Sequence, residues 1–163
     1  MSKTLCGSVT SRRPVAVLMA ALFGLTLALN PIAAPPANAV SVDAARAAVA
    51  VRALRVTAAQ VGIPYLWGGT TPRGFDCSGL SQYAYARVGK SLPRTAMQQY
   101  KATIRVKRGN QRAGDLIFLY SNGNVYHMGV YSGNGYFWHA PRTGSLVKNS
   151  RIWTTRYLIG RVR

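Results

Sequence analysis

Residues 40–163 predict a single α+β domain, in which helices come first and a mainly antiparallel sheet follows. Residues 41–61 are rich in alanine and contain neither proline nor glycine, which is typical of a helix. From Asp115 onward, short runs of β-branched and aromatic residues alternate with turns of glycine and asparagine. Helices followed by a meander of strands are typical of the α+β class. No repeat, low-complexity tract or linker indicates a second domain, so we expect one.

The first 39 residues resemble an export signal. A basic leader is followed by an apolar run at 15–29 and by Ala37-Asn38-Ala39, a small-residue pattern typical of a cleavage site. We therefore expect a mature chain that begins near Val40, covers residues 40–163 and has no membrane span. The alternative is an N-terminal anchor helix that is retained. The pair Arg12-Arg13 is compatible with twin-arginine export but does not distinguish that route from the general one.

Cysteine usage points to a reactive thiol. Cys6 precedes the apolar run, so it should leave with the leader, and Cys77 is then the single cysteine of residues 40–163. A single cysteine cannot form an intramolecular disulfide. In an exported protein, such a residue is a candidate nucleophile. The alternative is a small buried apolar side chain.

The chain is strongly basic, with 21 Lys and Arg against three acidic residues, all of them aspartate. Removal of the leader leaves a net charge of about +15. A basic surface attracts polyanions, and for an exported protein these are anionic wall polymers or an acidic membrane surface. Export argues against a nucleic-acid partner. The alternative is that the charge serves solubility alone.

We expect the first helix to span residues 41–61, with Ser41 or Asp43 as its N-cap and with Gly62 and Pro64 ending it. It should pack against the sheet as scaffold. The residues expected on its buried stripe are Val42, Ala45, Val49, Leu54 and Val61. The residues expected to face solvent are Arg46, Arg52 and Arg55.

A second helix is predicted over residues 77–88, with Asp76 as N-cap and Gly89 as the glycine after its end. The Cys77 sulfur then lies on the first helical turn, where unpaired N–H groups and the helix dipole favour the thiolate. The preceding loop, residues 63–74, is rich in glycine and proline and carries Tyr65 and Trp67. It either caps the core or lines a substrate site.

The remaining elements are shorter. A third helix is expected from Thr95 to about Lys101, followed by an irregular basic stretch that reaches Arg112. The expected strands are residues 116–120, 125–131, 136–140, 145–148 and 155–162.

The two histidines, His127 and His139, lie on consecutive predicted strands. Side chains alternate between faces along a strand, so the loop length decides whether the two share a face. A three-residue loop, with Gly135 in the left-handed bulge position, puts both on one face. We predict that loop, and we expect both imidazoles to point toward the helix start that carries Cys77.

This arrangement predicts nucleophilic catalysis by Cys77. His127 would take the thiol proton and return it to a leaving amine, and His139 would orient His127. Backbone N–H groups at Cys77, with the Tyr65 hydroxyl, would hold the oxyanion. One alternative is a zinc site of Cys77, His127 and His139, although their spacing matches no metal motif. Another is a pair of core histidines without chemistry.

Six blocks in order resemble the NlpC-type cell-wall peptidases, from about Ala45 to the C-terminus. They are residues 64–69 (PYLWGG), 74–80 (GFDCSGL), 92–95 (LPRT), 114–116 (GDL), 127–131 (HMGVY) and 139–140 (HA). Two departures, Ala113 where proline is frequent and Met128 where valine is usual, do not touch the proposed chemistry.

The resemblance implies a reduced papain-like fold with the nucleophile helix packed on a central antiparallel sheet. It also implies a secreted cysteine endopeptidase that cleaves peptidoglycan stem peptides through a thioester acyl-enzyme, typically between γ-D-glutamate and the following diamino acid. By position, Cys77, His127 and His139 correspond to a Cys-His-His triad. The residues that correspond to oxyanion or substrate-binding positions, or lie in the same blocks, are Tyr65, Trp67, Asp76, Ser78 and Arg94.

We accordingly expect a monomer that needs no cofactor or metal and acts in the cell wall or periplasm. Two alternatives keep the same fold. The domain could bind peptidoglycan without cleaving it, although a binder has no need of all three triad residues. It could also be an amidase, acyltransferase or transglutaminase, because an acyl-enzyme step is common to these reactions.

Overall fold

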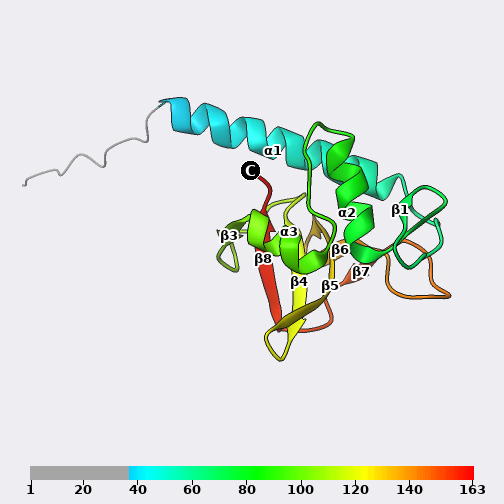
Figure 1. The fold of residues 1–163 in the computed structure, drawn as a ribbon. Helices are drawn as coiled ribbons and strands as arrows, with labels where there is room; N and C mark the ends of the chain where they lie inside the picture. Colours follow the sequence, from blue (N-terminus) through cyan, green and yellow to red (C-terminus); the bar gives the residue numbers. More distant parts are fainter. Residues whose placement is uncertain (1–36) are drawn as a thin grey trace, which may run out of the picture. The chain divides into compact units, whose positions relative to one another are not determined.

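The computed structural model describes residues 37–163. It consists of a six-stranded antiparallel sheet with helices packed on one side of it (Figure 1). The predicted α+β class is therefore confirmed. The predicted leader falls almost wholly outside the described residues. Between residues 37 and 163, no helix is both long and apolar enough to cross a membrane.

The sheet has the order β3-β8-β4-β5-β6-β7, and β1 and β2 form a separate two-stranded ribbon. The helices are α1 (Ala37–Ala58), α2 (Cys77–Ala86) and α3 (Ala96–Ala102), and the strands are β1 (Thr70–Thr71), β2 (Gly74–Phe75), β3 (Ile104–Val106), β4 (Leu116–Ser121), β5 (Asn124–Gly133), β6 (Tyr136–His139), β7 (Lys148–Arg151) and β8 (Tyr157–Arg161).

Helix α1 differs from its prediction at both ends. It begins at Ala37, so neither Ser41 nor Asp43 is its N-cap, and it ends at Ala58. Its buried residues are Ala50, Ala53 and Thr57. Two members of the predicted stripe, Val42 and Ala45, are exposed because only the C-terminal half of the helix packs against α2 and β5. A third exposed member, Val61, lies beyond the end of the helix.

Helix α2 has the predicted start and stop signals. The Asp76 side chain accepts a hydrogen bond from the N–H of Gly79, 2.7 Å away, as an N-cap does. At the other end, Gly89 has a φ of 80°, and the N–H of Lys90 donates to the carbonyl of Tyr85. This is the bonding pattern of a Schellman motif, which ends a helix at a left-handed residue.

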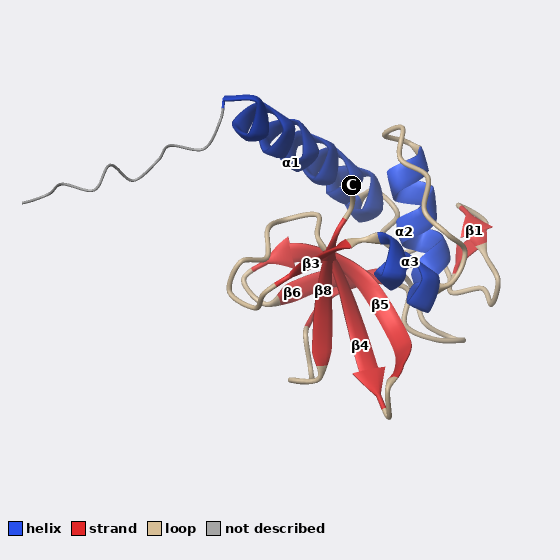
Figure 2. Ribbon diagram, turned by 60° about the vertical axis from the view of Figure 1, so that its left-hand side comes forward, coloured by secondary structure: helices blue, strands red, loops and turns tan. Residues whose placement is uncertain are grey.

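Helix α3 lies beside α2 and covers β4 and β5 (Figure 2). Thr95 caps it through a reciprocal capping box with Gln98, so the predicted start is correct. Strand β3 was not predicted. It lies in the stretch expected to be irregular and exists because Ile104–Val106 pairs with β8 at the sheet edge.

The predicted strand at residues 145–148 is also wrong in position. The strand is Lys148–Arg151, which pairs with β6. The apolar residues Leu146 and Val147 instead hold the loop before α2: Val147 donates its N–H to Ile63 and Leu146 bridges to Pro64. Cross-strand pairing, rather than apolar composition, therefore decides where this strand lies.

The core has one layer on each face of the sheet. On the helical face, Leu116 and Phe118 of β4 and Met128 of β5 pack with Ala53 and Tyr85 from the helices. Alternate residues of β4 and β5, together with residues of β6 and β8, form the other layer, which consists of Ile117, Leu119, Tyr131, Phe137 and Ile159.

Candidate active site

Strands β5 and β6 place the two histidines on one face of the sheet. Tyr131 pairs with Phe137. His127 lies four residues before Tyr131 and His139 two residues after Phe137, so alternation puts both imidazoles on the side of these two residues. This is the register that the sequence predicts.

The turn of this hairpin differs from the prediction, although the register is the same. Asn134 and Gly135 have φ values of 51° and 78°, which is typical of a two-residue type I′ turn. A bulge between Tyr131 and Gly133 then adds one residue to β5. The predicted three-residue loop is thus a two-residue turn plus a bulge. Either arrangement shifts the pairing of β5 with β6 by one residue relative to a plain two-residue turn, and so puts both histidines on one face.

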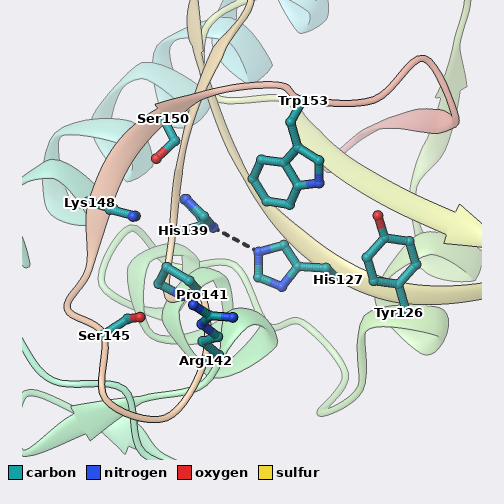
Figure 3. Close-up of a pocket in the computed structure, with 9 residues that line it drawn as sticks. All are labelled: Tyr126, His127, His139, Pro141, Arg142, Ser145, Lys148, Ser150 and Trp153. Atoms are coloured by element: carbon teal, nitrogen blue, oxygen red, sulfur yellow. Dashed lines mark hydrogen bonds between the residues drawn. The ribbon is translucent and has the colours of Figure 1, made fainter.

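The two imidazoles contact each other directly. The Nε2 atom of His127 lies 2.8 Å from the Nδ1 atom of His139, as a dashed line in Figure 3 shows. Both side chains are buried. The Nδ1 atom of His127 is the ring nitrogen that this contact leaves unengaged, and the contact restrains the orientation of the ring.

Cys77 is the first residue of α2 and is partly buried. Gly79 lets the helix start approach the preceding loop: a Cβ atom there would lie 1.9 Å from the carbonyl oxygen of Gly69. The backbone N–H of Met128, on β5, is directed at the Cys77 sulfur. The neighbouring strand β6 ends at His139. The sulfur therefore lies against the edge of β5, one residue from His127.

Cys77 and His127 line the same hollow, which has a volume of about 410 Å³. All but one of the site residues that the sequence predicts line this hollow. The exception is His139, which lies behind His127. The others are Tyr65, Trp67, Asp76, Cys77, Ser78, Arg94 and His127.

Burial sets the protonation of the imidazoles. It lowers the pKa of His127 from 6.5 to about 4. The pKa of His139 is lowered to about 3, first by burial and then by the charges of His127 and Lys148. Both rings are therefore neutral at pH 7, which is the form that a general base requires.

The protonation of the Cys77 thiol differs from the prediction that the helix start would favour the thiolate. Burial raises the pKa of Cys77, and the neighbouring Asp76 carboxylate raises it further, whereas backbone N–H groups at Cys77, Ser78 and Met128 lower it. The backbone N–H groups at the helix start do favour the thiolate, but burial has the larger effect on the pKa of Cys77. The resting pair is therefore a thiol and a neutral imidazole.

Tyr65 provides a hydroxyl in the same hollow. Burial raises the pKa of Tyr65, and the Cys77 thiolate would raise it further. The phenol therefore stays protonated and can donate a hydrogen bond to an oxyanion that forms on the sulfur side.

Asp76, Arg94 and Ser78 form a hydrogen-bonded cluster beside the sulfur. The Asp76 carboxylate forms an ion pair with Arg94 and accepts hydrogen bonds from the N–H groups of Gly68 and Gly79. Arg94 also donates to the Ser78 hydroxyl at 3.0 Å. Asp76 thus holds the helix start and the preceding loop together.

Trp153 is a site residue that sequence reasoning missed. It lies in the loop between β7 and β8, and its ring centre is 5.8 Å from that of His127 and 5.3 Å from that of His139 (Figure 3). The indole covers the outer side of the imidazole pair, although 55% of Trp153 is itself exposed. No local sequence signal marks this residue, because the contact exists only through the folded loop.

Replacement of Trp153 by alanine should raise the pKa of both histidines toward 6.5, because water would reach the imidazole pair. We expect a rise of about one unit for His127, measured by NMR titration of the ring protons. The chain has two histidines, so the assignment is direct. Trp153→Phe keeps an aromatic cover and should leave both values low. Unchanged pKa values in Trp153→Ala would show that the indole does not shield the rings.

The zinc alternative has no support in the geometry. Within residues 37–163, no group of three or more His, Cys, Asp and Glu side chains is arranged to hold a metal ion.

Comparisons with known proteins give one family. The model of the NlpC/P60 family matches residues 62–162. The probable endopeptidase YafL of Escherichia coli (strain K12) is 46% identical over 110 residues, which cover 61% of this chain and 44% of YafL. Murein DD-endopeptidase MepH of the same organism is 41% identical over 109 residues, which cover 61% of this chain and 40% of MepH. The match thus spans less than half of either protein.

Solved structures agree with this. The NlpC/p60 domain of the peptidoglycan hydrolase SagA has a TM-score of 0.63 and 32% sequence identity to this chain. The alignment covers 68% of this chain and 97% of the SagA domain, so the similarity extends over the whole of that domain.

Proposed function

Because the chain belongs to the NlpC/P60 family, we propose that it is a cysteine endopeptidase that hydrolyses peptidoglycan stem peptides. The proposal draws on relatives that are named as endopeptidases. The bond we propose is the one between γ-D-glutamate and the diamino acid that follows.

One observation supports this proposal above the others. Cys77 and His127 line a single hollow, and the far nitrogen of His127 lies 2.8 Å from His139. A nucleophile, a base and a group that orients the base are the minimum for acyl transfer by a thiol. A domain that only binds peptidoglycan would gain nothing from this arrangement.

We propose the following steps. His127 takes the proton of Cys77 as the sulfur attacks the γ-glutamyl carbonyl, and a tetrahedral intermediate forms. The amine of the diamino acid then leaves with the proton that His127 carries, and a thioester remains on Cys77. Water, deprotonated by His127, attacks the thioester and releases the carboxylic acid and the thiol.

The residues around the sulfur have separate roles in this scheme. The backbone N–H of Cys77 and the Tyr65 hydroxyl hold the oxyanion. Asp76 and Ser78 meet the amino end of the stem peptide, and an ammonium there would share the Asp76 carboxylate with Arg94. Trp67, which is 86% exposed, offers a flat apolar surface at the mouth of the hollow.

Mass spectrometry of purified muropeptides after incubation with residues 40–163 tests the proposal. The expected products are a fragment that ends in γ-D-glutamate and a fragment that begins with the diamino acid. Products cut at another bond would overturn the specificity that we propose. Products joined to a second amine would instead indicate a transferase.

The pH dependence of kcat/KM should follow the low pKa of His127. The base works only when it is neutral, so activity should persist as the pH falls below 6.5 and be lost as it falls through about 4. The measurement is a pH profile on a synthetic stem peptide, with pH-stability checked by preincubation. An acid limb near 6.5 would contradict the burial argument.

We also propose that the protein is exported and adheres to anionic wall polymers through its positive charge. Residues 1–39 would act as the signal, and the charge would hold the mature domain on the wall as a monomer. Binding to isolated cell walls should weaken steeply between about 50 mM and 500 mM salt, because salt screens exposed charges. Binding that does not change with salt would count against adhesion by charge.

A further inference from the structure

A second hollow lies on the outer side of the imidazole pair and has a volume of about 410 Å³ (Figure 3). It shares His127 with the hollow that contains the sulfur, so the two cavities meet at the proposed base. Its polar wall consists of two cations and two hydroxyls, which are Arg142, Lys148, Ser145 and Ser150.

Strand pairing places this wall next to His139. In the β6–β7 register, His139 lies opposite Lys148 and Phe137 lies opposite Ser150. Directly opposed residues share a face, so Lys148 and Ser150 stand on the side of the imidazole pair. Arg151, the next residue along β7, points to the other side.

The two cations have no side-chain carboxylate to neutralise them. The chain contains three acidic residues, and in the described part each pairs with an arginine elsewhere: Asp43 with Arg112, Asp76 with Arg94 and Asp115 with Arg161. Arg142 and Lys148 are therefore positive charges beside a hollow, without a negative partner.

His139 adds a donor that lacks an acceptor. If His127 is to accept the thiol proton at Nδ1, its Nε2–H must donate to Nδ1 of His139, and His139 then carries its own proton on Nε2. That Nε2 atom is buried and has no hydrogen-bond partner within residues 37–163. Figure 3 shows it turned away from His127, toward Lys148 and Ser150.

We propose that this second hollow binds the leaving half of the substrate and recognises a carboxylate on it, namely the one that ends the side chain of a diaminopimelate-type residue. The inference rests on the proposed function. His127 must protonate the leaving amine, so that amine lies beside His127 while the acyl group stays on the sulfur. The residue that carries the amine then extends into the cavity beyond His127.

Charge gives the selectivity. A guanidinium binds a carboxylate with two parallel hydrogen bonds, and Lys148 adds a second positive charge. Diaminopimelate keeps the side-chain ammonium of lysine and adds a carboxylate on the same carbon. Arg142 and Lys148 can bind that carboxylate, whereas a lysine side chain offers them an ammonium alone, which they repel. The hollow therefore predicts a preference between the two common diamino acids of stem peptides.

Two synthetic tetrapeptides test this subsite. Both have the sequence L-alanyl-γ-D-glutamyl-diaminopimelyl-D-alanine with an amidated C-terminus, and they differ only in a free or an amidated side-chain carboxylate. We expect the wild type to cleave the free form with a kcat/KM about tenfold higher. The double variant Arg142→Gln/Lys148→Gln should cleave both forms equally, at the rate of the amide. Arg151→Gln is the matched control and should keep the preference.

A binding measurement separates this inference from the proposed function. In Cys77→Ala, NMR titration with the same two peptides should show about tenfold tighter binding of the free carboxylate, and Arg142→Gln/Lys148→Gln in that background should remove the difference. If the wild type cleaves neither peptide, the proposed function fails while the binding result still decides the subsite. Equal binding or equal cleavage of the two peptides by the wild-type site would overturn the subsite.

Discussion

Replacement of Cys77 by alanine should lower kcat/KM on muropeptides by at least about 10⁴-fold, because the proposed acyl-enzyme cannot form without the sulfur. Stability should change by less than about 1 kcal/mol, since Cys77 is partly exposed and alanine is a good helix former. Activity is measured by mass spectrometry and stability by thermal unfolding monitored by circular dichroism.

Two further variants sharpen this result. Cys77→Ser keeps the size of the side chain but replaces the thiol with a hydroxyl of much higher pKa, so it should be almost as inactive as Cys77→Ala. Ser91→Ala, in the exposed loop after α2, is the control and should retain full activity. Cleavage by Cys77→Ala at the wild-type rate would rule out a thiol nucleophile. Retained binding without cleavage in that variant would distinguish an enzyme from a binding module.

Asp115→Asn should cost about 3–5 kcal/mol of folding free energy, which is the largest effect on stability that we expect from a single isosteric change. The Asp115 carboxylate is 1% exposed and accepts two hydrogen bonds from Arg161 and one from the N–H of Arg112. In Asp115→Asn, the amide NH₂ would face an N–H donor of Arg161 or Arg112 instead of accepting a hydrogen bond from it. The charge of Arg161 would also lose its partner. The measurement is chemical denaturation of the folded domain.

Asp43→Asn is the matched control for this prediction. Asp43 also forms an ion pair with an arginine, Arg112, but both partners are about half exposed. Exposed pairs contribute little because water and salt screen them. The denaturation midpoint of Asp43→Asn should therefore stay near that of the wild type. Equal destabilisation by the two substitutions would mean that burial does not set the strength of these pairs.

Features that depend on neighbouring residues in the sequence were predictable. Asp76 and Gly89 mark the two ends of α2 because capping uses backbone groups within one turn of the helix end. The shared face of His127 and His139 follows from alternation and one assumption about the turn. The α+β class and the NlpC/P60 family, which six short blocks indicated, are confirmed by the fold and by the family match.

Features that depend on distant contacts were not predictable. Trp153 covers the imidazoles only because β7 returns beside β6 and the following loop folds back. The raised pKa of Cys77 follows from burial by segments far apart in the sequence, whereas the helix-start argument considered one helix alone. Likewise, Leu146 and Val147 look like a strand by composition, yet their backbone groups bond to the loop before α2.

The protonated resting state of Cys77 has a consequence for the durability of the protein. Peroxides and alkylating agents attack thiolates much faster than thiols, so a sulfur that stays protonated is oxidised slowly. In a compartment without a reducing system, a permanently ionised cysteine would be converted to sulfinic acid and lost. For an exported enzyme with Cys77 as its nucleophile, which is what we propose, a thiol that is ionised only during catalysis would be oxidised more slowly than a permanent thiolate.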